Sequence, residues 1–236
     1  MSCPKCAAIA LKPKRARQLQ QGEGLFDAIV RFISGPRQAA PPAVRKTLAN
    51  TTNLKVTRLQ VSRQPLAPVL EVAMTYLSDG MWDRAKQQLG YDKVFHTGLV
   101  CTLANGEVKR LEKNEVISIT NFKRKSNEEL IDIPLKKTTN MTDLIKNAEE
   151  HLGKWNLYTY HPTDRNCQDF AVGVIESNGE SIKMTEGVKE FVKQDSQSLG
   201  DKMGVMAKLA ATAATNLAGR LNHAVYGTGY STRPRL

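Results

Sequence analysis

The stretch that decides the fold is VFHTGLVCTL, residues 94–103. Leu99, Cys101 and Leu103 occur at every second position, so in an extended chain all three point to one side while His96 points to the other. Apolar residues that alternate in this way are typical of strands. The pattern predicts a β-strand with one apolar face in the core and a histidine on the opposite face.

The residues on either side of this strand predict a small antiparallel sheet. Asn105 and Gly106 form a pair that strongly favours a hairpin turn, so a second strand is expected near 107–112 and a third at 115–120. Upstream, LKVTRLQV at 54–61 alternates imperfectly, as a strand with a bulge does. Short turns join neighbouring antiparallel strands, so we expect these segments to lie side by side.

Apolar residues spaced three and four apart predict helices around this sheet. One of them begins at Asn140, a good capping residue, with Asp143 at its third position. The expected helices cover residues 24–34, a segment from Pro68, residues 140–152, a segment from Cys167 to Asn178, and about 201–221. Residues 123–139 and the aromatic stretch 155–165 are expected to be loops. The expected fold class is α+β, with the helix that carries Cys167 packed on the sheet.

The charge of the chain is unevenly distributed. Among its 236 residues, 34 are Lys or Arg and 23 are Asp or Glu, a net charge of +11. Residues 1–65 carry 12 basic and 2 acidic side chains, residues 66–200 carry 17 and 20, and residues 201–236 carry 5 and 1. We therefore expect a folded domain at 51–200 between a basic arm at 1–50 and an Ala-rich helix with a basic tail at 201–236.

Composition excludes several classes of protein. Apolar residues make up 41% of the chain, too many for a disordered or collagen-like sequence. No apolar run approaches the roughly 18–20 residues of a membrane-spanning helix, and the N-terminus lacks the apolar stretch of a secretory signal. Four cysteines are too few for a disulfide framework. We expect an intracellular, cytoplasmic protein, or one held inside a virion or other large complex, and neither a secreted nor a transmembrane one.

Two residues are candidates for chemistry. Cys167 is expected at the N-terminus of a helix, where free N–H groups and the helix dipole lower the pKa of a thiol, and Asp164 or Thr163 is available as the cap. A nucleophilic thiol needs a base, and His96 is the histidine on the core strand. The alternative is that Cys167 only packs in the core and that His96 is a core histidine with satisfied hydrogen bonds.

The order and neighbours of these two residues resemble a known superfamily. FHTGLV at 95–100, followed by NCQDF at 166–170, is similar to the circularly permuted papain-like thiol hydrolases, in which the histidine precedes the cysteine. Two branches are the PPPDE family of ubiquitin-like isopeptidases and the lecithin retinol acyltransferase and NlpC-like group. The His-Thr pair and the spacing from Gly90 to His96 look more like the PPPDE branch. The resemblance covers about residues 54–195 and implies a circularly permuted papain-like fold.

The resemblance also implies a reaction. Cys167 would be the nucleophile and His96 the general base of a cysteine-dependent hydrolase or acyl transferase, which attacks an isopeptide, amide or ester bond and forms an acyl-enzyme. The acyltransferase branch has a third polar residue on the next strand, and here Glu107, Arg110 and Glu112 are all available. The PPPDE branch uses a Cys-His dyad. The implied substrate is a protein or lipid acyl group, and no cofactor is expected.

Asn166 and Gln168 stand on either side of the candidate nucleophile. They would orient the site or donate to an oxyanion, or they would only fix the turn and the start of the helix.

Cys3 and Cys6 form a CxxC pair, which is half of a zinc-ribbon site. A metal ion would need Cys101, a histidine or another chain as further ligands. The alternative is a redox or incidental pair.

The basic arms point to binding partners. Such arms bind acidic proteins, anionic lipid or nucleic acid through non-specific Coulomb attraction, or they only keep the chain soluble. Sequence-specific nucleic-acid binding is not expected, because residues 1–22 lack the interleaved aromatic side chains that stack on bases. The amphipathic helix at 24–34 is expected to dock on protein, with a lipid interface as the alternative. We expect both arms to contact other protein chains.

The alternative to an enzyme is a structural or interaction component of a large assembly such as a virion. Such a protein would keep the fold and use its arms as tethers, with or without activity. Alkylation of Cys167 near neutral pH, compared with that of Cys101, separates the two hypotheses.

Overall fold

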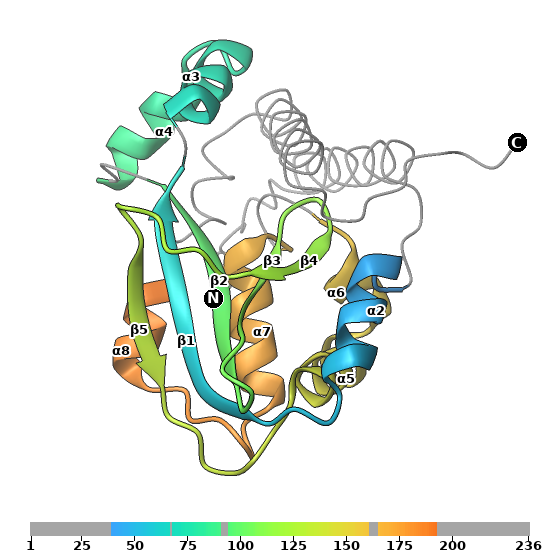
Figure 1. Ribbon diagram of the computed structural model, residues 1–236. Coiled ribbons are helices and arrows are strands. Elements are labelled where there is room, and N and C mark those ends of the chain that lie inside the picture. Colours follow the sequence, from blue (N-terminus) through green and yellow to red (C-terminus); the bar gives the residue numbers. More distant parts are fainter. Residues whose placement is uncertain (1–38, 67, 91–93, 161–164, 193–236) are drawn as a thin grey trace, which may run out of the picture. The chain divides into compact units, whose positions relative to one another are not determined.

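The fold is α+β (Figure 1). The computed structural model describes residues 39–66, 68–90, 94–160 and 165–192. These residues form a five-stranded antiparallel sheet and seven helices. The expected helices at 24–34 and 201–221, the Cys3 and Cys6 pair, and the two expected arms apart from residues 39–50 lie outside the described residues.

The strands are β1 (Val56–Pro65), β2 (Phe95–Leu103), β3 (Val108–Lys113), β4 (Ile117–Asn121) and β5 (Glu129–Ile133). The helices are α2 (Pro42–Thr51), α3 (Pro68–Leu77), α4 (Met81–Leu89), α5 (Met141–Leu152), α6 (Lys154–Tyr158), α7 (Cys167–Ser177) and α8 (Glu186–Val192).

Strand β2 lies at the centre of the sheet, whose order is β4-β3-β2-β1-β5. It pairs antiparallel with β1 on one side and with β3 on the other. The turn into β3 contains Asn105 and Gly106, and Gly106 has a φ of +85°, which glycine adopts without strain. The antiparallel sheet predicted for residues 54–120 is therefore confirmed.

The imperfect alternation in β1 is a β-bulge. The pairing with β2 shifts register between Val56 and Arg58. The extra residue turns the strand so that Val56, Leu59 and Val61 are all buried, with at most 4% of each exposed. The spacing of three between the first two of these apolar residues therefore follows from the bulge.

Strand β5 corrects the prediction that residues 123–139 form only a loop. It pairs antiparallel with β1 at the edge of the sheet. Two ion pairs join the same strands: Arg58 to Asp132 at 2.6 Å and Arg63 to Glu129 at 2.7 Å. The strand was hidden in the sequence because it has only five residues, and two of them, Glu129 and Asp132, are charged.

Several helices differ from the sequence predictions, and α4 and α8 were not expected at all. Helix α6 forms one turn inside the stretch expected to be an aromatic loop, directly after Gly153. Helix α2 lies in the segment assigned to the arm, yet it packs against α5 and β4 and buries Val44 and Leu48. The folded part therefore begins before residue 51. Helix α3 starts where Pro68 predicts it, but two residues of its apolar stripe are exposed, Val72 and Tyr76.

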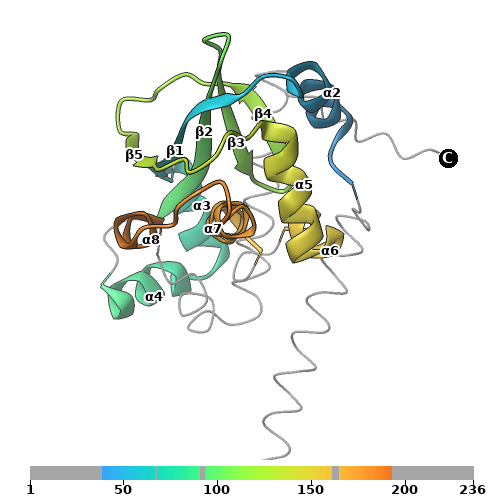
Figure 2. The same cartoon turned by 90° about the horizontal axis from the view of Figure 1, so that it is seen from below.

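Helices α5 and α7 pack on one face of the sheet (Figure 2). Leu99, Cys101 and Leu103 are at most 1% exposed, so the alternation predicted for β2 is confirmed. On this face the sheet and the two helices share one core, which includes Leu111, Leu144, Ala171, Val174 and Ile175. This packing sets the first turn of α7 beside the start of β2.

The opposite face of the sheet carries polar side chains and is crossed by a loop. Because β4 and β5 lie at opposite edges, the residues that connect them must pass β3, β2 and β1. We call residues 122–128 the crossing loop. The carboxylate of Glu128, 3% exposed, accepts hydrogen bonds from Nη2 of Arg110 at 2.6 and 2.7 Å. Arg110 neighbours the core residue Leu111 on β3 and therefore points to the other face. A buried ion pair thus holds the crossing loop on the sheet.

We expect Glu128→Gln to lower the free energy of unfolding by about 3 kcal/mol, because the Arg110 guanidinium is left buried without a charge partner. Glu129→Gln, the adjacent position, is the matched control. It removes an exposed ion pair with Arg63, so we expect a loss below about 1 kcal/mol. Urea denaturation measures both. Equal losses would show that the buried pair does not hold the loop.

Candidate active site

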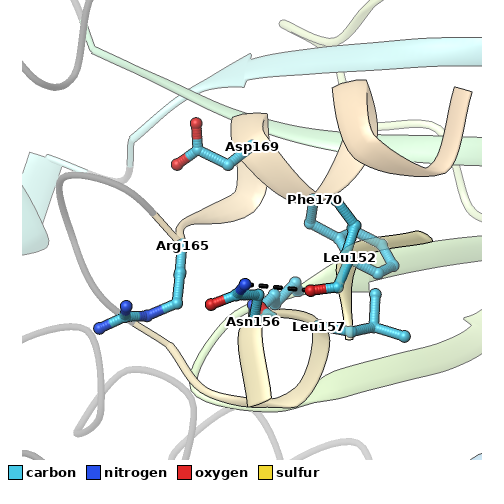
Figure 3. Close-up of a pocket in the computed structure, with 7 residues that line it drawn as sticks. Leu152, Asn156, Leu157, Arg165, Asp169 and Phe170 are labelled. Carbon is cyan, nitrogen blue, oxygen red and sulfur yellow. Dashed lines mark hydrogen bonds between the residues drawn. The ribbon is translucent and has the colours of Figure 1, made fainter. Parts of the chain in front are cut away.

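Helix α7 begins at Cys167 because Asn166 caps it. The side-chain oxygen of Asn166 accepts hydrogen bonds from the N–H groups of Gln168 and Asp169 at 2.8 and 3.2 Å. The Asp169 carboxylate, seen on the first turn in Figure 3, accepts one in return from the N–H of Asn166 at 3.1 Å. This capping box takes the place of the cap predicted at residues 163–164. The helix start, and with it the thiol, is therefore fixed locally.

Cys167 and His96 meet at this end of the helix. The thiol of Cys167 forms a hydrogen bond with the ring of His96, and the backbone N–H of Thr97 donates to the same sulfur. The side-chain amide of Gln168 donates to the carbonyl oxygen of Phe95 at 3.5 Å, which connects the helix to the first residue of β2. The structure thus brings together His96 and Cys167, the two residues that the sequence analysis treats as a pair.

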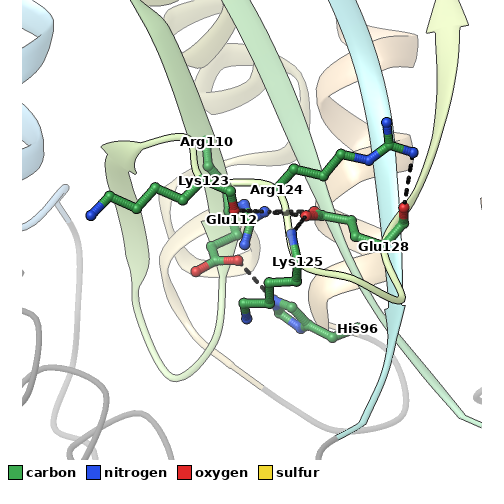
Figure 4. Close-up of polar contacts among 7 residues, drawn as sticks. All are labelled: His96, Arg110, Glu112, Lys123, Arg124, Lys125 and Glu128. Carbon is green, nitrogen blue, oxygen red and sulfur yellow. Dashed lines mark hydrogen bonds and ion pairs between the residues drawn. The ribbon is translucent and has the colours of Figure 1, made fainter.

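Glu112 completes the arrangement from strand β3 (Figure 4). Its Oε2 lies 3.0 Å from Nε2 of His96, and Glu112 is 7% exposed. Since Nε2 is engaged by the carboxylate, Nδ1 is the ring nitrogen available to the sulfur. Of the three residues left open by the sequence, Glu107 pairs with Lys109 at the surface and Arg110 pairs with the crossing loop. Only Glu112 of the three reaches the histidine.

The absence of a side chain at Gly98 allows Glu112 to lie close to strand β2. The two residues are paired across β2 and β3. A Cβ at position 98 would lie 3.3 Å from Cβ of Glu112 and 3.4 Å from the carbonyl oxygen of Leu111. Both neighbours belong to a paired strand and yield little. A glycine here therefore lets β3 bring its carboxylate to the histidine at the unperturbed strand spacing.

Burial opposes ionisation of all three groups, but their charges favour one another. Burial lowers the pKa of His96, and the negative charges and hydrogen bonds of Cys167 and Glu112 outweigh it and raise that pKa to about 10. Burial raises the pKa of Cys167, yet the charge and hydrogen bond of His96 and the N–H of Thr97 bring it below its ordinary value. The pKa of Glu112 is lowered too, because the charge and hydrogen bond of His96 outweigh its burial. The site therefore favours the charged forms of all three groups, the thiolate, the imidazolium and the carboxylate, more than each group would alone.

Asn166 and Gln168, the weaker candidates, are both buried and both take part in positioning the helix. The side-chain oxygen of Asn166 accepts the two N–H groups of the cap. The side-chain amide of Gln168 is directed to the carbonyl oxygen of Phe95. These contacts correspond to the second of the two roles that the sequence left open, the fixing of the turn and the helix start.

A cavity of about 230 Å³ lies beside the first turn of α7 (Figure 3). Phe170, Leu152 and Leu157 give it an apolar part, while charged groups come from Lys113, Arg165 and Asp169, and Asn156 completes the lining. Cys167 is not among the lining residues. The cavity is therefore a neighbour of the candidate site and not the place where a scissile bond would meet the thiol.

Within the described residues, no group of three or more His, Cys, Asp or Glu side chains is arranged to hold a metal ion. Cys101, which was considered as a further zinc ligand, is fully buried in the core, and burial raises its pKa to about 12. None of the described helices has both the length and the apolar character needed to cross a bilayer.

Comparison of the chain with protein-family models, with curated proteins and with solved structures finds no match.

Glu112 is the functional candidate that sequence reasoning did not single out. The signal for it lies in the register of the hairpin: a turn at Asn105 and Gly106 places Glu112 opposite Gly98, two residues along β2 from His96. Register of this kind depends on the length and type of the turn. A one-residue change in the turn would have presented Leu111 in its place.

We expect the alkylation rate of Cys167 by iodoacetamide to rise with pH through a midpoint below about 8.5, the ordinary thiol pKa. Cys101 should stay unreactive over the same range. His96→Gln should move the midpoint upward, because it removes the charge that favours the thiolate. Peptide mapping by mass spectrometry assigns the rates to each cysteine. A midpoint that His96→Gln leaves unchanged would contradict the ion pair.

We expect Gly98→Ala to lower the free energy of unfolding by about 1–3 kcal/mol through overpacking, and to slow the alkylation of Cys167. Gly187→Ala on α8 is the control, because a Cβ there meets only Ile131 at 3.9 Å, an ordinary contact. That variant should be neutral or slightly stabilising. Alkylation at the wild-type rate in Gly98→Ala would show that the close pairing with Glu112 is not required.

Proposed function

We propose that this chain is a cysteine-dependent hydrolase or acyl transferase that acts on an isopeptide, amide or ester bond. The observation that supports it is the hydrogen-bonded series from Cys167 to His96 to Glu112, in which the thiol opens a capped helix. A low-pKa thiol, a histidine and a group that orients the histidine are the parts that nucleophilic acyl transfer needs.

The reaction would run in two halves. The thiolate of Cys167 attacks the carbonyl carbon, and the C=O electron pair moves to the oxygen, where the positive end of the α7 dipole favours negative charge. Collapse of this intermediate breaks the bond to the amine or alcohol, which takes a proton from the His96 imidazolium. In the second half, neutral His96 removes a proton from water or an acceptor, which attacks the thioester and releases Cys167. Glu112 holds the ring and stabilises its protonated form.

The proposal includes the fold family. A histidine on an early central strand, a cysteine that opens a later helix and a polar third residue on the next strand agree with a circularly permuted papain-like hydrolase. The third residue favours a triad over the dyad of the PPPDE branch. An intracellular setting, in the cytoplasm or within a large assembly, belongs to the same proposal.

The test is a panel of activity probes that carry either a ubiquitin-like chain or a lipid ester. We expect Cys167→Ala to abolish labelling and His96→Gln to slow it by about 100-fold or more. Glu112→Gln should slow it by about tenfold, which corresponds to one unit in the pKa of the pair. Glu107→Gln, a surface carboxylate of the same hairpin, is the control and should label at the wild-type rate.

The outcome also decides between the enzyme and the structural alternative. A chain that keeps this fold only as an assembly component would leave Cys167 no more reactive than Cys101 toward every probe. That result, in folded protein, would overturn the proposed function.

A further inference from the structure

Three consecutive cationic residues lie in the crossing loop: Lys123, Arg124 and Lys125. All three are exposed. In the part of the chain that the structure describes, no carboxylate side chain forms an ion pair with any of them. The two acidic residues nearest in sequence are already engaged, since Glu128 binds Arg110 and Glu129 binds Arg63. The loop therefore presents three positive charges to solvent.

The backbone that carries these charges is anchored to the sheet by Arg110 of β3 (Figure 4). Nη2 of Arg110 donates to both oxygens of Glu128 and to the carbonyl oxygen of Lys123, the last at 3.4 Å. The N–H of Lys125 donates to Glu128 at 3.1 Å. The ring of Phe122 lies 5.0 Å from the Arg110 guanidinium. A partner that binds the three cations therefore meets a loop whose backbone is already ordered, which reduces the entropy cost of binding.

The same anchor places the charges beside the candidate site. Arg110 and Glu112 are two residues apart on β3 and project from the same face. In Figure 4 the side chain of Lys125 extends toward Glu112 and the ring of His96. The positive charges of Arg110 and Lys125 are among the influences that lower the pKa of Glu112, after the larger effect of His96. The crossing loop thus forms one rim of the site.

We propose that the crossing loop binds an acidic segment of a protein substrate, close to the bond that Cys167 attacks. This inference rests on the proposed function, and it names the substrate class: a polypeptide with several Asp or Glu residues near the scissile bond. Three exposed cations attract such a segment over a distance of about 10 Å at moderate salt and orient it before the reacting groups meet.

The chemistry of the loop favours a polypeptide over a membrane surface. Interfacial binding to lipid needs apolar side chains that enter the bilayer beside the basic ones. The exposed residues of the loop are Lys123, Arg124, Lys125 and the polar pair Ser126 and Asn127. The aromatic ring of Phe122 is partly buried against Arg110. A loop whose exposed side chains are only charged or polar is therefore expected to bind an extended acidic polypeptide and not a membrane.

The test compares two fluorescent peptide chloromethyl ketones that differ only in three residues, Glu-Glu-Glu or Gln-Gln-Gln, placed at several distances from the electrophile. In full-length protein we expect Cys167 to react about tenfold faster with the best acidic probe at low ionic strength. The preference should fall toward onefold as salt screens the loop. The triple variant Lys123→Gln, Arg124→Gln and Lys125→Gln should reduce it to less than about twofold at low salt as well.

A matched variant removes the same charge elsewhere. Lys136, Lys137 and Lys183 lie at the far end of α7, where residues 135 and 182 form a bridge and Lys136 contacts the carbonyl oxygen of Gly179. Their replacement by Gln should leave the acidic preference at its wild-type value. Equal losses in the two triple variants would show that only net charge matters, and would overturn the proposal.

The remaining outcomes are distinct. A reactive Cys167 with no acidic preference would overturn this inference and leave the proposed function standing. If Cys167 reacts with neither probe, both this inference and the proposed function are overturned. Sedimentation with phosphatidylserine vesicles that depends on the same three residues, without an acidic preference, would assign the loop to lipid and overturn the proposal for a polypeptide.

Discussion

The imidazole of His96 is hydrogen-bonded to the thiol of Cys167 and to the carboxylate of Glu112, and each partner comes from a different element. Burial disfavours every one of the three charges when it stands alone. Together they favour one another, so the pKa of the histidine rises and that of the thiol falls. The arrangement therefore requires that α7 and β3 both be placed correctly against β2. The rest of the fold supplies that placement.

Strand β2 positions both α7 and β3, because one of its faces packs against α7 and the other lies close to Glu112 of β3. One face carries Leu99 and Cys101 into the core shared with α7, which fixes the helix against the sheet. The other carries Gly98, whose missing side chain lets Glu112 of β3 lie close. The capping box at Asn166 then determines the residue at which the helix starts. The core and the contacts among Cys167, His96 and Glu112 thus depend on the same ten-residue stretch, residues 94–103.

Sequence reasoning predicts the parts of this arrangement that are local. Alternation identifies β2, the Asn105 and Gly106 pair identifies the hairpin, and the apolar stripe from Cys167 identifies α7, although the cap expected at residues 163–164 is Asn166. It leaves Glu112 among three candidates, because the choice depends on a register that pairs residues across two strands. It misses β5, whose pairing with β1 and ion pairs across more than 60 residues have no local signal. Long-range pairing is what single-sequence patterns do not carry.

The crossing loop connects the topology of the sheet with the proposed specificity. A sheet with β4 and β5 at opposite edges obliges the chain to cross one face, and here it crosses the face that carries His96 and Glu112. Anchoring by the Arg110 and Glu128 pair costs desolvation of two charges, and a well-packed apolar pair would often be at least as stable. What the ion pair supplies is a defined position for the backbone of the loop. The connection that the topology requires is therefore an ordered, charged loop beside His96 and Glu112. For this reason we place substrate selection in the crossing loop and not in the cavity beside α7.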